Sequence, residues 1–327
     1  MPLLVRCRGG RAGFPGEARP GLDRALIHAS VLRYLVEIAR LGSIRRAAAA
    51  LNIASSAVNR QVLRVERELG IKLFDRMPDG MRLTPAGELL IRHVRDTLYG
   101  YNQLLADIDS LSGIKSGHVR ITALDSLLVD FLPRVLEAIS ERHDAISFSV
   151  LSTSPGAVFQ AVAVGEADLG LTFVAPARPA LQLVASVRAP LGAVMVRSHP
   201  LAGSASLTFA EIASYPVLLQ NESLPSASLL DDEFGVFRAE ARPRFVSNSI
   251  EMLRHIVRAG LGIAFFTRLG FLRDIASGDL VWIPIAWRRP EALQIGLYIP
   301  AQRTLSPAAG MVVNGLVRGF EELEGTA

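Results

Sequence analysis

The most constraining feature of the 327-residue chain is the stretch from Ser43 to Thr84, in which short helix-forming segments are separated by tight turns. Ser43 has the chemistry of an N-cap, and the alanine-rich residues 44–51 predict a short helix that another helix can approach closely. A further helix is predicted over residues 55–69, and Gly70 ends it. Two short helices joined by a tight turn predict a helix-turn-helix.

The two faces of the helix predicted over residues 55–69 differ in chemistry. The side chains expected to face inward are apolar: Val58, Val62, Val65 and Leu69. Those expected to face outward are small, polar or cationic: Ser55, Ser56, Asn59, Arg60, Arg64 and Arg67. The major groove of DNA admits a helix with such an outer face, and Asn59 can pair bidentately with adenine. We therefore predict that Asn59 reads a base.

Residues 71–84 predict a hairpin, because two short strand-like runs enclose a Pro-Asp-Gly turn. Such a hairpin is the wing of a winged helix-turn-helix and lies along the phosphate backbone of DNA, where each neutralised phosphate adds salt-dependent affinity. We expect Arg60, Arg64, Arg76 and Arg82 to hold phosphates.

Charge is distributed unevenly along the chain, which carries +4 at pH 7. Residues 1–84 contain fifteen Lys or Arg and seven Asp or Glu, so this part carries +8 and the remainder −4. The asymmetry predicts a polyanionic partner for the N-terminal part. The alternative is that Arg is simply the usual cation here, since only Lys72 and Lys115 are lysines. Residues 1–24, rich in Gly, Arg and Pro, are expected to be disordered, to form a basic arm that supplements DNA binding, or to reflect an early start codon.

Composition bounds the class of protein. A chain with 50% hydrophobic and 20% charged residues can bury sizeable cores, and it has no apolar run long enough to span a membrane. The first residues lack the apolar core of a secretory signal, which predicts a cytoplasmic location. Cys7 is the only cysteine, so an intramolecular disulfide and a Cys-based metal site are excluded, and no cofactor or metal is expected.

A long helix is predicted over residues 85–112, with Thr84-Pro85 as N-cap and first residue. Its apolar side chains follow alternating four- and three-residue steps, interrupted only by Thr97: Leu90, Val94, Tyr101, Leu104, Ile108 and Leu111. This spacing is typical of a coiled-coil seam and predicts a dimerisation helix. Packing of the seam on its own domain is the alternative.

After a Gly/Ser-bearing hinge at residues 113–118, strands and helices alternate, which predicts an α/β domain over residues 119–325 with a mostly parallel sheet in its first part. Strands are expected near residues 119–123, 146–151 and 168–173, and a helix over 127–142. A second set of strands and helices lies between about residues 189 and 289. Residues 290–325 look like a return to the first lobe, which predicts two lobes, 119–188 with 290–325 and 189–289.

Polar side chains gather where these strands end and helices begin. Ligands of open α/β sheets bind at such positions, and helix N-termini with hydroxyl groups bind anions, so a small carboxylate-bearing metabolite is the expected ligand. Simple helix capping is the alternative reading of each residue. The candidate ligand-binding residues are Asp125, Ser126, Ser152, Thr153, Ser154, Ser247, Asn248, Ser249 and Thr267. Asp125 would suit an ammonium or hydroxyl donor.

An enzyme is not expected. The chain has no Gly-x-Ser-x-Gly elbow, P-loop, Gly-x-Gly-x-x-Gly turn or His-Glu-x-x-His motif, and its six histidines are scattered. An architectural DNA binder is the other alternative, but it would leave the two-lobed domain without a purpose.

The residues from Leu32 to Glu88 resemble the LysR-type transcriptional regulators. The resemblance rests on the Gly-Ser before the second helix, the Ala-Ala-Leu run, Ala57-x-x-Arg60-Gln61, Glu66-x-x-Leu69-Gly70, Leu73-Phe74-x-Arg76 and Leu83-Thr84-x-Ala86-Gly87. It implies a winged helix-turn-helix over residues 25–84, a linker helix and an effector domain similar to periplasmic binding proteins, often in tetramers. Ala54-Ser55-Ser56 replaces the family's usual Ser-Gln-Pro, which leaves the usual base contacts and operator open.

The resemblance implies a set of partners: promoter DNA, a small-molecule effector, further copies of the chain as a homodimer or homotetramer, and RNA polymerase. The complete set of candidate DNA-binding residues is Ser43, Arg45, Ser55, Ser56, Asn59, Arg60, Arg64, Arg76 and Arg82.

Overall fold

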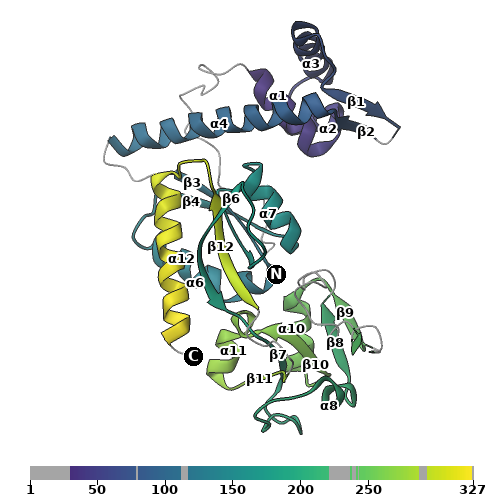
Figure 1. Ribbon diagram of the computed structural model, residues 1–327, viewed down its shortest axis with the longest axis vertical. Helices are drawn as coiled ribbons and strands as arrows, with labels where there is room; N and C mark the ends of the chain where they lie inside the picture. The colour runs from purple at the N-terminus through teal and green to yellow at the C-terminus, as the bar shows by residue number, and fades with distance from the viewer. Residues whose placement is uncertain are drawn as a thin grey trace, which may run out of the picture. The chain divides into compact units, whose positions relative to one another are not determined.

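The computed structural model describes residues 30–78, 80–111, 117–220, 236–237, 241, 243–286 and 293–325. The chain divides into two compact units, Met1–Val94 and Arg95–Ala327, each considered by itself (Figure 1). The expectations for residues 1–24 and for hinge residues 113–116 lie outside the described residues.

The first unit contains the predicted helices and hairpin. In chain order these are α1 (Ser30–Leu41), α2 (Ile44–Ala50), α3 (Ser55–Leu69), β1 (Phe74–Met77), β2 (Gly80–Leu83) and the start of α4 (Pro85–Leu111). Ser43 is the N-cap of α2 and accepts a hydrogen bond from the backbone N–H of Arg46. Asn52 takes the turn between α2 and α3 with a φ of 55°, in the left-handed region that Asn tolerates.

The inward face of α3 differs from the prediction at its last position. Val58 and Val62 are buried in the core of this unit and Val65 packs against it, but the Leu69 side chain is 52% exposed. The expectation for Leu69 was wrong, because Glu66 takes the inward position on the last turn and is only 7% exposed. Hydrogen bonds between the Glu66 carboxylate and the wing offset the free-energy cost of burying it.

The second unit contains two five-stranded sheets. The lobe-one sheet has the order β4-β3-β5-β12-β6 and the lobe-two sheet β11-β7-β10-β8-β9. The lobe-one strands are β3 (Gly117–Ala123), β4 (Ile146–Ser152), β5 (Leu169–Phe173), β6 (Leu181–Arg188) and β12 (Gln294–Pro300). The lobe-two strands are β7 (Leu191–Val196), β8 (Val217–Gln220), β9 (Phe245–Ser247), β10 (Ile263–Thr267) and β11 (Leu280–Pro284).

The helices of this unit are α5 (Asp125–Val129), α6 (Phe131–Ser140), α7 (Pro155–Ala163) and α12 (Pro307–Gly325) in lobe one. Lobe two has α8 (Phe209–Ala213), α10 (Ile250–Arg258), the 3-10 turn η1 (Arg268–Gly270) and α11 (Leu272–Ser277). In lobe one α12 packs beside α6, and α7 lies on the opposite face of the sheet (Figure 1). The one helix predicted over residues 127–142 is two, because the chain breaks at Asp130.

Both sheets are mixed, whereas the sequence predicted a mostly parallel sheet for lobe one. In lobe one, β3 pairs in parallel with β4 and β5, but β12 is antiparallel to both β5 and β6. The antiparallel strands β6 and β12 are those by which the chain leaves lobe one and returns to it, and Ala189 N–H donates to Leu293 O where these two crossings meet. Lobe one therefore contains the return segment that the sequence predicted, together with β6, which it did not identify.

Candidate functional site

In the first unit the recognition helix and the wing meet through one side-chain contact. Arg76 on β1 donates from Nη2 to Oδ1 of Asn59 on α3, at 3.2 Å. A hollow of 230 Å³ lies between α3 and the wing and is lined by both residues. The arrangement brings the candidate base reader and a candidate phosphate-binding arginine to one surface.

The wing is fixed to α3 by the buried carboxylate of Glu66. Its Oε1 accepts hydrogen bonds from the backbone N–H groups of Leu73 at 2.9 Å and Phe74 at 3.3 Å, and its Oε2 pairs with Lys72 Nζ at 3.0 Å. Burial by itself would raise the pKa of Glu66, but the hydrogen bonds from Leu73, Lys72 and Phe74 outweigh it, and the pKa is lowered from its usual 4.5. The ionised carboxylate therefore sets where β1 begins relative to α3.

The other candidate DNA-binding residues are distributed around this surface. Arg45, Ser55, Ser56, Arg60, Arg64 and Arg82 are all exposed. Arg64 forms an ion pair with Glu68 at 2.7 Å on one flank of α3, and the hydroxyl of Ser43 is already engaged as an N-cap. Ala54, the N-cap of α3, has no side-chain acceptor for the first N–H groups of that helix.

The predicted dimerisation seam divides along α4. Leu90 packs against the core of the first unit and Val94 is 1% exposed, whereas Leu104 is 47% and Ile108 49% exposed. Tyr101 and Thr97 are half-buried, and the side chain of Leu111 is not described. Helix α4 therefore contributes to its own domain at the start of the seam and presents apolar side chains further along.

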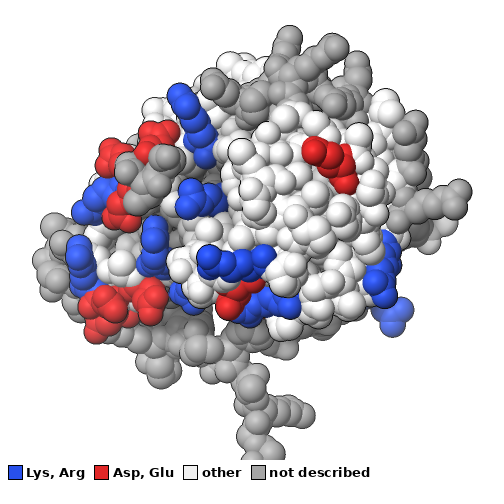
Figure 2. Space-filling view, turned by 90° about the horizontal axis from the view of Figure 1, so that it is seen from below, with Lys and Arg blue, Asp and Glu red and all other residues white. Residues whose placement is uncertain are grey.

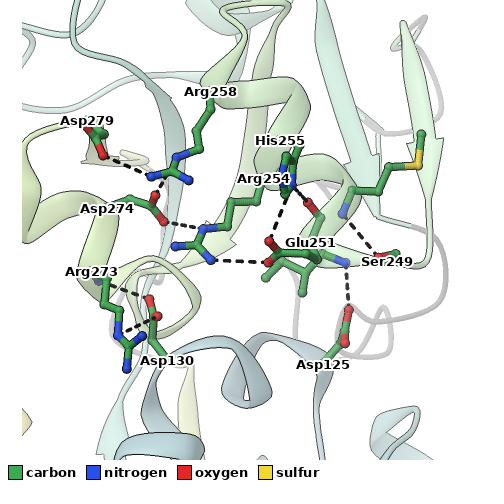
Figure 3. Close-up of polar contacts among 12 residues, drawn as sticks. Asp125, Asp130, Ser249, Glu251, Arg254, His255, Arg258, Arg273, Asp274 and Asp279 are labelled. Carbon is green, nitrogen blue, oxygen red and sulfur yellow. Dashed lines mark hydrogen bonds and ion pairs between the residues drawn. The ribbon is translucent and has the colours of Figure 1, made fainter. Parts of the chain in front are cut away.

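In the second unit the candidate effector residue Asp125 joins the two lobes. Its Oδ2 accepts a hydrogen bond at 2.8 Å from the backbone N–H of Ile250, the first residue of α10 (Figure 3). The neighbouring Ser126 lies against Gly270 of η1, where an added Cβ would come within 3.2 Å of the Ser126 backbone oxygen. Glycine at 270 therefore allows α5 and η1 to approach closely across the lobes.

The remaining candidate effector residues end strands or begin helices next to Asp125. Ser152 ends β4, and its hydroxyl lies 3.5 Å from Asp125 Oδ1; Thr153 follows it half-buried, and Ser154 is the exposed N-cap of α7. In lobe two, Ser247 ends β9 and its hydroxyl accepts the Ser249 N–H, Asn248 is exposed, and Ser249 caps α10 through Met252 N–H. Thr267 ends β10, is 4% exposed, and its hydroxyl has no hydrogen-bond partner among the described residues.

Sequence reasoning missed Gln220 and Asp130. Gln220 ends β8 beside Ser247, is 5% exposed, and its side-chain nitrogen has no partner in the described part of the chain. The sequence signal that could have identified Gln220 is its position as the polar residue that ends the apolar run Pro-Val-Leu-Leu. Asp130 is 3% exposed and bridges the lobes, accepting from Arg273 N–H at 3.1 Å, but it lay inside a segment predicted as continuous helix.

An ion-pair network holds α10 and α11 together beside this bridge. Asp274, 1% exposed, accepts from Arg254 Nε at 2.6 Å, and Arg258 Nε lies 3.0 Å from its other oxygen (Figure 3). Burial alone would lower the pKa of Arg254, but the Asp274 carboxylate raises it. Figure 2 shows that Lys and Arg side chains lie beside Asp and Glu in mixed groups on the described part of the face seen from below.

Taken together, a helix-turn-helix with a wing and a two-lobed α/β unit define a DNA-binding protein with a ligand-binding domain. Residues 30–88 match the bacterial regulatory helix-turn-helix protein, lysR family, and residues 112–320 match the LysR substrate binding domain. The chain therefore belongs to the LysR family: it is a DNA-binding transcriptional regulator with an effector-binding domain, and not an enzyme.

Curated relatives agree with this family. The chain is similar to the RuBisCO operon transcriptional regulator of Allochromatium vinosum, with 27% identity over 279 residues covering 85% of this chain and 92% of the relative. It is also similar to the HTH-type transcriptional regulator CysB of Haemophilus influenzae, with 27% identity over 259 residues covering 77% and 78% of the two chains.

Solved structures show the same fold at low identity. A full-length OxyR variant of Pseudomonas aeruginosa superposes with a TM-score of 0.62 at 18% identity, covering 89% of this chain and 94% of that one. Full-length CbnR in complex with its target DNA gives 0.56 at 18% identity, covering 88% and 98%. Across the residues that the structure describes, no helix is long and apolar enough to cross a membrane.

Proposed function

We propose that this regulator reads promoter DNA with α3 and the wing, Asn59 contacting a base and Arg60, Arg64, Arg76 and Arg82 contacting phosphates. The observation that carries this assignment is the hydrogen bond between Arg76 and Asn59, because it puts a base-reading amide and a phosphate-binding cation on one surface. Ser55 and Ser56, exposed at the uncapped N-terminus of α3, add hydroxyl and N–H donors for phosphate.

The regulator acts as a homodimer, or as a homotetramer built from dimers, through the exposed part of the α4 seam. One recognition helix reads only a half-site, so pairing two copies adds affinity and specificity. The apolar side chains of Leu104 and Ile108, nearly half exposed on a 27-residue helix, support an intermolecular seam. A small-molecule effector bound at the strand ends of the two lobes modulates DNA binding or recruitment of RNA polymerase.

Selection of binding sites tests the DNA-reading role. Full-length protein is mixed with fragmented genomic DNA, and a recovered duplex is compared with a shuffled duplex of the same composition in a titration at fixed salt. The recovered duplex should bind about 10³-fold or more tightly than the shuffled one. Equal affinities would show that the protein binds DNA without reading sequence.

Isothermal titration with a panel of metabolites tests the effector site. A metabolite that binds wild type should bind Ser126→Ala more weakly, since Ser126 lies against Gly270 where the lobes meet. A metabolite that binds both proteins equally would place the effector elsewhere.

A further inference from the structure

Asp125 provides a carboxylate to the N-terminus of a helix in the other lobe. Helix α10 has nine residues, and its N-cap Ser249 satisfies the N–H of Met252. The N–H of Ile250, at the first position, is satisfied by Asp125 Oδ2 at 2.8 Å. A negative charge is favoured at this end of a helix because the N–H groups and the helix dipole both point toward it. Asp125 therefore accepts the hydrogen bond that the carboxylate of a bound ligand would accept there.

Asp130, at the other end of α5, forms a second bridge of a different kind. It is 3% exposed and meets Arg273 through both the backbone N–H, at 3.1 Å, and the guanidinium, with Nε 3.6 Å from Oδ1. Asp125 is half-buried, and its partners are a backbone N–H and, at 3.5 Å, the Ser152 hydroxyl. Of the two carboxylates, Asp125 is the one beside the candidate effector residues.

Two buried polar groups at the same edge lack partners. The strand register pairs Gln220 with Ser247, three residues before Ile250, and Thr267 ends the strand on the other side of β8. Among the residues that the structure describes, Gln220 Nε2 and Thr267 Oγ1 have no hydrogen-bond partner, although both residues are more than nine-tenths buried. Buried polar groups are normally paired, so these two point to a ligand that supplies an acceptor for the Gln220 amide.

We propose that Asp125 is an internal ligand of the α10 N-terminus, and that it excludes effectors whose carboxylate would bind there. This inference rests on the proposed effector site and changes its chemistry. The effector is a neutral or cationic compound that directs a hydroxyl or ammonium donor to Asp125 and an acceptor to Gln220. The carboxylate-bearing metabolite expected from sequence would place two anions at one helix end.

The test asks whether a small anion restores the thermal stability that the full-length protein loses when Asp125 is replaced. Thermal unfolding measures that stability. Asp125→Ala removes the internal carboxylate and should lower the Tm by about 2 to 4 °C, the scale expected for loss of a helix-end interaction in a domain of this size. Sodium acetate or formate should recover most of this loss, compared with sodium chloride at equal ionic strength. Wild type should respond identically to acetate and chloride.

Asp125→Asn is the matched control, because its amide oxygen still occupies the position while the charge is gone. It should melt between wild type and Asp125→Ala and show no specific response to acetate. The proposal is overturned if Asp125→Ala melts like wild type, or if acetate stabilises wild type as much as the alanine variant. DNA binding is measured on the same samples. Failure of the wild-type protein to bind DNA would count against the proposed function. Failure of acetate to restore the Tm of Asp125→Ala, with normal DNA binding, would count only against the role of Asp125.

Discussion

Arg76 of the wing donates a hydrogen bond to the Asn59 side-chain oxygen of the recognition helix, and the distance between Nη2 and Oδ1 is 3.2 Å. The contact orients the Asn59 amide before DNA is bound. Bidentate pairing with adenine needs both the oxygen and the nitrogen of that amide, and the oxygen has two lone pairs, so it can accept from Arg76 and from the adenine amino group together. The other N–H groups of the Arg76 guanidinium are available to a phosphate.

Asn59→Ala and Arg76→Ala are therefore expected to affect different quantities, the preference between duplexes and the overall affinity for DNA. Asn59→Ala should lower the preference for the specific over a shuffled duplex by about 1 to 3 kcal/mol. Arg76→Ala should weaken both duplexes and reduce the slope of log affinity against log salt by about 1. Titrations at several salt concentrations measure both quantities.

The control for this pair is Arg67→Ala, which removes an exposed arginine of the same helix that donates to the Leu63 backbone oxygen. It should leave the preference between duplexes unchanged. The base-reading role of Asn59 is wrong if its alanine variant weakens specific and shuffled DNA equally.

Glu66 predicts a pH dependence of the wing. Its pKa is lower in the folded protein than its usual 4.5, so the folded state binds its proton less readily than the unfolded state. The stabilisation is therefore fully present above about pH 4.5 and is lost as pH falls through the lowered pKa. Glu66→Gln should cost about 1 to 3 kcal/mol at neutral pH, because two buried N–H groups lose a charged acceptor.

Amide hydrogen exchange at Leu73 and Phe74 checks this prediction locally. Exchange should be about tenfold or more faster in Glu66→Gln at neutral pH, and the difference from wild type should shrink when both are measured below pH 4. Glu68→Gln is the control, since its carboxylate is exposed and pairs with Arg64 on the surface. A difference that stays constant with pH would show that shape, and not charge, anchors the wing.

The sequence predicted the elements well wherever local chemistry decides them. Ser43 as N-cap, Gly70 in the left-handed region and the hairpin of the wing depend on neighbours in the chain, and these expectations agree with the structure. The inward position of Glu66 was not predicted, because its partners lie seven and eight residues away across the start of the wing.

The surroundings of the candidate effector residues were harder to predict, because their contacts join distant segments. The sequence proposed Asp125 as a candidate effector residue, but not that it would accept from Ile250, which is 125 residues further along the chain. Gln220 became a candidate only when the strand register placed it beside Ser247. Hydroxyl-rich helix starts indicated an anion site, and only the folded chain reveals that a carboxylate of the protein already occupies one of them.

Gly270→Ala is expected to disturb the contact between lobes. An added Cβ would lie 2.9 Å from Ile250 Cδ1 and 3.2 Å from the Ser126 backbone oxygen, so α5 and η1 must separate. The free energy of unfolding should fall by about 1 to 3 kcal/mol, as for other overpacked sites. Gly203→Ala is the matched control, because no described residue has an atom within 4 Å of its added Cβ. Equal unfolding midpoints in urea for the two variants would contradict a close interlobe contact.

The exposed half of the α4 seam predicts how the protein assembles. Replacing both Leu104 and Ile108 with Asp places two charges where an apolar seam would be buried, and each buried unpaired charge opposes association strongly. Sedimentation equilibrium should show a shift toward monomer, and DNA affinity should fall because the two half-sites are no longer read together. Leu89→Asp is the control: Leu89 is 64% exposed on the same helix but lies outside the seam, so its variant should sediment like wild type. If the double variant keeps the wild-type mass, Leu104 and Ile108 do not form the interface, and the effector-binding domain must supply it.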